Sequence, residues 1–276
     1  MRGAGRVAME RPEWAPADVD LSRPSVARAY DYWLGGSHNF EVDREFARQA
    51  LAAVPDLRLV ARANREFLHR AVRFMLDEGI RQFLDIGSGI PTVGNVHEIA
   101  QQVDPHSRVA YVDIDPVAVT HSTHILAGQP NAVALLEDLR HPEAILDHPE
   151  VRRLLDLDRP VGLLLVSVVH AVPDHDDPYG LIRRLWTALA PGSCVAISHV
   201  TTDSRPDEMG EGARLSGRTN TPVTARTRAQ VEDFFTGLDL VEPGVVWSPL
   251  WRPESEADVG EHPERMSFYV GVGRRR

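Results

Sequence analysis

The sequence contains no lysine, so all 30 basic residues of the 276-residue chain are arginine. This absence excludes both a Schiff-base lysine and the phosphate-binding lysine of a P-loop. Cysteine is almost absent too: Cys194 stands alone, which excludes an internal disulfide and any metal site with several thiolate ligands. Because Cys194 falls in an apolar segment, we expect it to be a small buried side chain and not a nucleophile.

Long apolar runs and an excess of positive charge are also missing. No apolar run approaches the roughly 20 residues of a membrane-spanning helix, and residues 1–20 hold no apolar segment like that of a secretory signal. We therefore expect a cytoplasmic protein with no membrane partner. The formal net charge of −10 argues against a nucleic-acid partner, which needs a cationic face. No strong metal-ligand motif occurs, and no metal is predicted.

The chain divides into three parts by pattern. Residues 1–20 are rich in proline, arginine and acids, which predicts a flexible N-terminus. Residues 21–78 have helical spacing and predict a helical cap or lid. Residues 79–276 alternate strand and helix patterns, which predicts a mostly parallel sheet with helices on its faces. The strands are expected at 82–86, 109–114, 132–136, 161–169 and 194–200, with an antiparallel pair at 240–247 and 267–272. The helices are expected at 24–34, 41–53, 57–78, 92–102, from 116, 178–189 and 228–235.

A glycine-rich turn follows the first expected strand. In residues 84–92, Gly87 and Gly89 allow a sharp turn and a close approach of the backbone to a ligand. Thr92 stands where a dinucleotide fingerprint has its third glycine, which admits a pyrophosphate. The ligand implied is a nucleoside that lacks a pyrophosphate and carries a cationic amino-acid tail. Asp85, just before the turn, is placed to accept a hydrogen bond from an amino group of the ligand or from an ordered water.

Acidic residues follow the next two strands. Asp113 is expected to accept hydrogen bonds from both hydroxyls of a ribose. Asp115 is a second choice, and its alternative role is to cap the helix that opens at Pro116. Asp138 is expected to bind an adenine amino group, and its alternative is a solvated acid in a loop. The residues expected to complete the binding site are Ser88, Ile114, Leu139 and Ser167.

These features together resemble a known motif series. Residues 85–89, Asp113, Asp138 and the turn at 189–192 resemble the motifs of class I S-adenosylmethionine-dependent methyltransferases. The resemblance implies a Rossmann-like α/β fold with a mostly parallel seven-stranded sheet and an antiparallel last strand, preceded by the N-terminal helical cap.

A narrower resemblance lies in the cap. Residues 27–40, 43–44 and 62–68 look like the N-terminal signature of a bacterial subfamily called S-adenosyl methyltransferase, formerly catalogued as a domain of unknown function. This resemblance implies S-adenosylmethionine as cofactor and S-adenosylhomocysteine as product, but it does not identify the methyl acceptor. We expect a small-molecule acceptor, because the acidic net charge disfavours a nucleic acid. Residues 201–226, which lack clear periodicity, are expected to help cover the acceptor.

Part of the cap is expected to contact the cofactor. Tyr30, Gly35, Gly36 and Asn39 predict a lid in which the glycines permit close approach and Asn39 makes a polar contact. The alternative is ordinary packing at the end of a helix. Arg65 is placed to bind the methionine carboxylate in a bidentate fork. Its alternative is a surface salt bridge.

Two histidines are candidates for a general base. His170 follows the fourth strand and His199 ends the fifth, so both lie near the edge where the methyl group is expected. The alternative for each is a histidine whose nitrogens are bound by backbone groups. Two other functions compete with methyl transfer: a sensor that binds S-adenosylmethionine or S-adenosylhomocysteine without catalysis, and a nicotinamide oxidoreductase, which Thr92 disfavours. The acceptor and the oligomeric state are not predicted.

Overall fold

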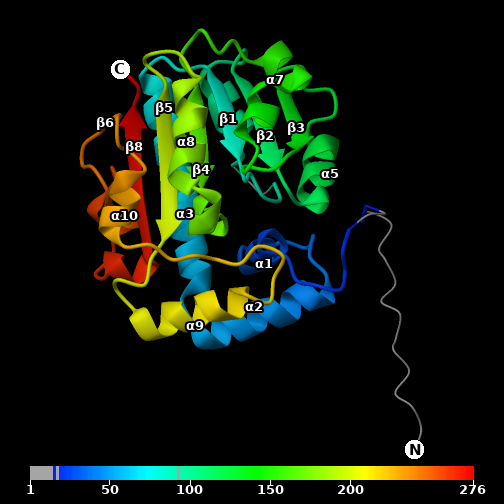
Figure 1. Ribbon diagram of the computed structural model, residues 1–276, viewed down its shortest axis with the longest axis vertical. Helices are drawn as coiled ribbons and strands as arrows, with labels where there is room; N and C mark the ends of the chain where they lie inside the picture. The colour runs from blue at the N-terminus through cyan, green and yellow to red at the C-terminus, as the bar shows by residue number, and fades with distance from the viewer. Residues whose placement is uncertain (1–14, 17–18, 92–93) are drawn as a thin grey trace, which may run out of the picture.

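A single mixed sheet forms the centre of the protein. The structure, a computed structural model, describes residues 15–16, 19–91 and 94–276. Among these residues, eight strands form one sheet in the order β3-β2-β1-β4-β5-β8-β6, with β7 also paired to β8 (Figure 1). Strands β1 to β5 are parallel, whereas β8 runs antiparallel to β5 and pairs antiparallel with β6 and β7. The predicted α/β fold with an antiparallel last strand is confirmed.

Three of the strands have the predicted bounds and the others differ in detail. The strands are β1 (Gln82–Ile86), β2 (Arg108–Asp113), β3 (Ala132–Leu136), β4 (Gly162–Val166), β5 (Cys194–Val200), β6 (Asp239–Leu240), β7 (Val246–Trp247) and β8 (Phe268–Arg274). The strand expected at 161–169 ends earlier, because Ser167 has a φ of 61° and a 3-10 turn follows it. The strand expected at 240–247 is split into β6 and β7, and Gly244 between them has a φ of 81°.

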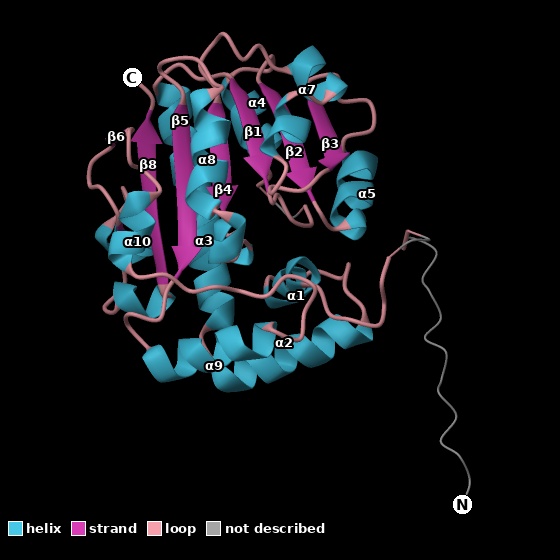
Figure 2. Cartoon of the chain, viewed as in Figure 1, coloured by secondary structure: helices cyan, strands magenta, loops and turns pink. Residues whose placement is uncertain are grey.

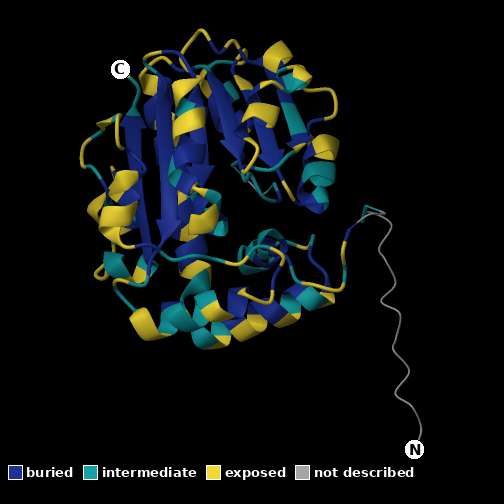
Figure 3. Ribbon diagram, viewed as in Figure 1, coloured by how far each residue is buried: buried dark blue, intermediate teal, exposed yellow. Residues whose placement is uncertain are grey.

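Helices cover both faces of the sheet. They are α1 (Val26–Trp33), α2 (Glu41–Ala53), α3 (Leu57–Asp77), α4 (Val96–Val103), α5 (Pro116–Ile125), α6 (Pro142–Leu146), α7 (Pro149–Leu154), α8 (Pro178–Thr187), α9 (Pro206–Ser216) and α10 (Arg228–Asp233). One apolar cluster packs α3 and α4 on the sheet, and a second packs α6, α7, α8 and α10 on the other face. Figure 3 shows the strands between them as buried. No helix of the described residues is long and apolar enough to cross a membrane.

The helix after the glycine-rich turn starts later than predicted. Asn95 precedes the first residue of α4, and the backbone N–H groups of Gly94 and Asn95 both donate to Glu98. Thr92, where the sequence predicts the helix to begin, lies outside the described residues. Most of the N-terminus predicted as flexible lies outside them too.

Helices α1, α2 and α9 lie across the carboxyl ends of the parallel strands (Figure 2). A buried ion cluster anchors them there: Arg28 on α1 donates to Asp43 on α2 at 2.8 Å and to Asp115 at the start of α5 at 3.2 Å. All three side chains are at most 2% exposed. The cap is therefore joined to the sheet at the loop after β2, beside the predicted nucleoside site.

Candidate functional site

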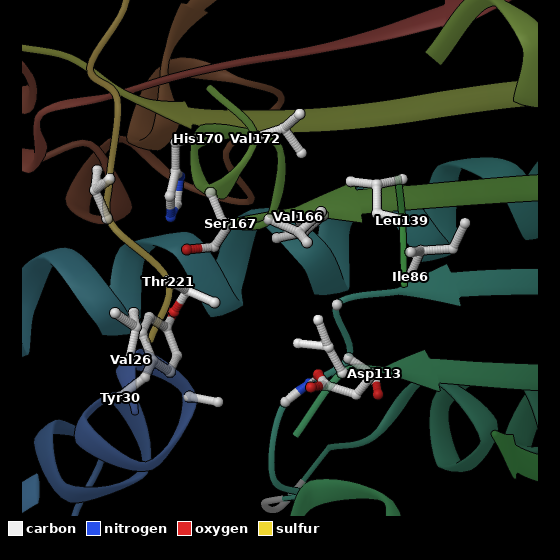
Figure 4. A pocket seen from close by; sticks show the side chains of 18 of the residues that line it. Val26, Tyr30, Ile86, Asp113, Leu139, Val166, Ser167, His170, Val172 and Thr221 are labelled. Atoms are coloured by element: carbon white, nitrogen blue, oxygen red, sulfur yellow. Dashed lines mark hydrogen bonds between the residues drawn. The ribbon is translucent and has the colours of Figure 1, made fainter. Parts of the chain in front are cut away.

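A cavity of about 480 Å³ opens between the cap and the carboxyl ends of β1, β2 and β4. This volume is in the range typical of pockets for small molecules and cofactors. Of the predicted site residues, it is lined by Tyr30, Arg65, Asp85, Gly87, Ser88, Gly89, Asp113, Ile114, Asp138, Leu139, Ser167 and His170. Figure 4 shows side chains from the strand ends on one side of the cavity and Val26 and Tyr30 of α1 on the other.

The glycine-rich turn brings bare backbone to the cavity wall. Gly87 has a φ of 73°, and a Cβ there would approach the Val168 side chain to 2.3 Å. Gly89 has a φ of 67°, and its N–H donates to Asp113 at 2.7 Å. Both glycines therefore do what the sequence predicts: they make a turn that L side chains would strain or block.

Asp113 and Asp115 divide the two roles that the sequence left open. Asp113 lines the cavity and accepts the backbone N–H groups of Gly89 and Asp115. Burial raises the pKa of Asp113 to about 6. Asp115 does not line the cavity; it caps α5 by accepting the Val117 N–H at 2.9 Å, and it also binds Ser25 and Arg28. The capping role is thus the right one for Asp115.

Asp85 is a buried acid without a partner. Its side chain accepts no hydrogen bond from any described residue although it is only 5% exposed, and burial raises its pKa to about 7 against the opposing charge of Arg65. Arg65 makes one long hydrogen bond, to the Gly94 carbonyl at 3.3 Å, and no ion pair with a described acid. The Asp85 carboxyl group and the Arg65 guanidinium group therefore both lie beside one cavity and can each bind a charged group of a ligand. Buried charged groups in proteins are normally paired.

The cavity wall after β2 and β3 combines apolar side chains with an ion pair. Ile114 is 45% exposed and Leu139 is buried, and both line the cavity. Asp138 is held by Arg140, whose Nε lies 2.9 Å from one carboxylate oxygen. Burial opposes ionisation of Asp138, but the hydrogen bonds from Arg140 lower its pKa overall. Asp138 is therefore an ion-paired acid in the loop after β3, at the cavity wall, and its contact with an adenine amino group stays a prediction.

A chain of hydrogen bonds links the cap to the end of β4. Tyr30 donates to the Ala61 carbonyl and accepts from Asn64 at 3.1 Å. Ser198 donates to Asn64 at 2.6 Å and accepts the Ser167 N–H at 2.8 Å. The chain holds Ser167 in its left-handed conformation, which a residue other than glycine adopts mainly where the surroundings enforce it. The Ser167 hydroxyl itself has no hydrogen bond to a described residue, and it projects into the cavity in Figure 4.

The two histidines differ in availability. His170 lines the cavity, and its buried Nδ1 has no hydrogen-bond partner among the described residues. Burial lowers the pKa of His170 to about 4, so its ring is neutral at physiological pH. His199 does not line the cavity. Its Nε2 accepts from Arg226 at 2.8 Å and its Nδ1 lies 2.9 Å from the Val200 carbonyl, so both nitrogens are engaged. The predicted role of His199 as a base is therefore not supported by its position.

Gly35, Gly36 and Asn39 also lie away from the cavity, contrary to the predicted direct contact. A Cβ on Gly36 would meet the Asp31 carboxylate, and Asn39 donates to that carboxylate at 2.8 Å. Gly35 has a φ of 88° just after the end of α1. These residues position Asp31, which does line the cavity. The positions of Gly35, Gly36 and Asn39 agree better with the alternative interpretation, ordinary packing at the end of helix α1.

Several residues of the site were missed from the sequence. Asn64 lies within the 62–68 segment, but nothing in its spacing indicates that it joins Tyr30 to Ser198 across three elements. Residues 220–224 line the cavity, as expected of the 201–226 region, although α9 within it was not predicted. Among the residues described, no group of three His, Cys, Asp or Glu side chains could hold a metal ion.

Comparison with known proteins places the chain among relatives of similar length. The family model described as S-adenosyl methyltransferase matches residues 12–276. A DUF574 family protein from Streptomyces avermitilis is 43% identical, with 92% of this chain and 98% of that chain covered and a TM-score of 0.88. A candidate methyltransferase from Thermobifida fusca is 41% identical, with 96% and 100% covered and a TM-score of 0.88. No curated protein matches the chain.

Proposed function

Because the chain belongs to the S-adenosyl methyltransferase family, we propose that it binds S-adenosylmethionine in the 480 Å³ cavity and transfers the methyl group to a small-molecule acceptor. The observation that carries this proposal is the buried Asp85, which has no hydrogen-bond partner among the described residues and lies near Arg65 at a glycine-rich turn. We further propose that the protein acts in the cytoplasm.

The cavity fits both ends of this cofactor. Asp85 and Arg65 match the ammonium and carboxylate groups of the methionine end. Arg65 lowers the pKa of Asp85 by its charge, but neither side chain forms a hydrogen bond or ion pair with an oppositely charged side chain among the described residues. Asp113 keeps lone pairs for ribose hydroxyls beyond the two backbone N–H groups that it accepts. Ile114 and Leu139 offer apolar faces for an adenine ring, with Asp138 at its edge.

S-adenosylmethionine, when bound, supplies an electrophilic methyl group on a sulfonium sulfur and leaves as S-adenosylhomocysteine. The residues of the chain hold the reactants in line and exclude water, which is most of what such a displacement needs. The neutral ring of His170 is placed to accept a proton from an acceptor O–H or N–H. Ser167, held by Ser198, presents its hydroxyl at the same wall.

Calorimetric titration with S-adenosylmethionine and S-adenosylhomocysteine tests the proposal. We expect micromolar binding to the wild type and at least about 100-fold weaker binding to Asp113→Ala. The variant loses the carboxylate proposed to bind the ribose hydroxyls, and it loses the hydrogen bond that holds the Gly89 turn. Asp147→Ala is the matched control, since the Asp147 side chain is 71% exposed and its ion pair among the described residues is with Arg152. A folded wild type that binds neither ligand would overturn the proposal.

The affinity for S-adenosylhomocysteine is expected to depend on pH. An ammonium group binds the ionised form of Asp85, so binding is full above the pKa of about 7 and weakens as Asp85 takes up a proton at lower pH. Protonation of Asp113, with its pKa of about 6, adds to the loss. We expect the dissociation constant to rise roughly tenfold for each pH unit below the Asp85 pKa of about 7. Titrations from about pH 8 to about pH 5.5 measure this, and a constant affinity would contradict the role of Asp85.

A further inference from the structure

A second cavity, of about 100 Å³, adjoins the first beneath the cap. It lies among α1, α2, α9 and the ends of β5 and β8, and we call it the side chamber. Five residues line both spaces and so form their junction: Val26, Tyr30, Ser167, His170 and Val223. Figure 4 shows Val26, Tyr30, Ser167 and His170 at one end of the main cavity, with Asp113, Ile86 and Leu139 at the other. The side chamber thus opens at the end away from the proposed nucleoside site.

The side chamber is apolar and carries no charge. Its walls include Trp33, Phe46, Met209 and Phe268, and no described residue that lines it bears a formal charge at neutral pH. Away from the junction, the described polar groups in the walls are bonded to the protein itself: Trp33 Nε1 donates to the Ala47 carbonyl at 3.3 Å. The hydroxyl of Ser216 donates to the Ala213 carbonyl at 2.6 Å. A dry cavity of about 150 Å³ with such walls holds a benzene ring, so this chamber suits a group of about one ring or smaller.

In the described part of the side chamber's wall, the polar atoms without a hydrogen bond lie at the junction. Among the described residues that line the side chamber, the Ser167 hydroxyl has no hydrogen bond, and His170 Nδ1 is buried without one. The Tyr30 hydroxyl, by contrast, is already bonded to Ala61 and Asn64. A buried polar atom without a partner costs free energy, so a ligand with a polar atom at this point would be favoured.

We propose that the side chamber binds the apolar end of the methyl acceptor, which is a compact, uncharged molecule of about one ring with an O–H or N–H group at the junction. This inference rests on the proposed methyl transfer. A lone pair on the acceptor atom forms the bond to the methyl carbon while the carbon–sulfur bond breaks and its electron pair stays on sulfur. The acceptor proton passes to the neutral His170 ring, and Ser167 orients the acceptor atom. A small acceptor is favoured because the chamber, of about 100 Å³, has room only for a group of about one ring.

Phenol and benzoate are the probes, titrated into the full chain saturated with S-adenosylhomocysteine. The two share a ring, but benzoate carries a charge that the chamber does not match. We expect phenol to bind at least about tenfold more tightly than benzoate. Ala225→Phe adds a ring to the chamber wall and is expected to weaken phenol binding at least about tenfold, with the affinity for S-adenosylhomocysteine kept within about twofold. Ala188→Phe makes the same change at the exposed end of α8 and is the matched control.

The outcomes separate this inference from the proposed function. Failure of S-adenosylhomocysteine to bind defeats the proposed function, and phenol titrated without it still reports on the chamber. No phenol binding to the wild type, equal binding to Ala225→Phe, or tighter binding of benzoate would overturn the inference. If circular dichroism shows that Ala225→Phe does not fold, Ala213→Leu fills the chamber from α9 and decides the question in the same way.

Discussion

Replacing Asp85 with asparagine is expected to abolish measurable binding of S-adenosylhomocysteine and, in the same variant, to raise the thermal stability of the ligand-free protein. The first effect follows because Asp85 is the acid proposed to meet the ammonium group, and asparagine supplies no charge. The second follows because this carboxyl is buried and has no hydrogen-bond partner among the described residues. A residue kept for folding would show the opposite change in stability.

The size of the stability change follows from the pKa of Asp85. The folded-state pKa of about 7 lies above the ordinary aspartate value of 3.8, so folding is penalised increasingly as pH rises from about 4, and the penalty is complete above about 7. A difference of roughly three pH units corresponds to about 4 kcal/mol as an upper bound. At pH 8 the variant should therefore melt roughly 8–15 °C above the wild type, and near pH 4 the two should melt together. Melting curves at both pH values measure this.

The matching control is a ligand that lacks the amino-acid tail. 5′-Methylthioadenosine keeps the nucleoside but has no ammonium group, so Asp85→Asn should bind it as the wild type does. Asp113→Ala, which alters the proposed ribose site, should lose both ligands. If Asp85→Asn loses 5′-methylthioadenosine as well, Asp85 shapes the cavity instead of binding the tail.

The features that sequence reasoning predicted well are local ones at strand ends. Parallel strands bring their carboxyl ends to one edge, so Asp85, Gly87, Asp113 and Asp138 could be assigned to a common site once the strands were identified. The turn requirements of Gly87 and Gly89 are also local, because they depend on backbone conformation next to a strand. Both inferences, the shared edge of the sheet and the glycine turn, need only the positions of the strands in the sequence.

The features that it predicted poorly depend on contacts between distant segments. Asn39 and Gly36 resemble ligand-binding residues in composition, but they hold Asp31, and that contact is set by how α1 ends. His199 has a favourable place in the strand order, yet Arg226 occupies its Nε2 from 27 residues further along the chain. The spacing of residues in the sequence does not show which distant residue will form a hydrogen bond with a given polar group. Overlap of roles is the general difficulty, since packing and ligand binding use the same residue types.

The second large effect is expected at Arg28, the cation that joins the cap to the sheet. Arg28→Met keeps much of the side-chain volume but leaves Asp43 and Asp115, both at most 2% exposed, without their cation. Removing one partner of a buried ion pair typically costs about 3–5 kcal/mol. We therefore expect the melting temperature to fall by roughly 6–20 °C. Thermal unfolding followed by circular dichroism measures the change.

Arg23→Met is the control for this change, because Arg23 lies five residues away and is exposed. Among the described residues its side chain donates to the Thr219 carbonyl, and the variant keeps the Arg23 carbonyl that accepts from Arg28. It should shift the melting temperature by no more than about 2 °C. If the loss at Arg28 comes from an uncompensated charge, adding Asp115→Asn to Arg28→Met should restore part of the stability, since the amide can still accept the Val117 N–H that begins α5. No recovery in the double variant would mean that packing around Arg28 matters more than its charge. Either way, α1 carries Val26 and Tyr30 into both cavities, so the affinity for S-adenosylhomocysteine should fall together with the stability of the cap.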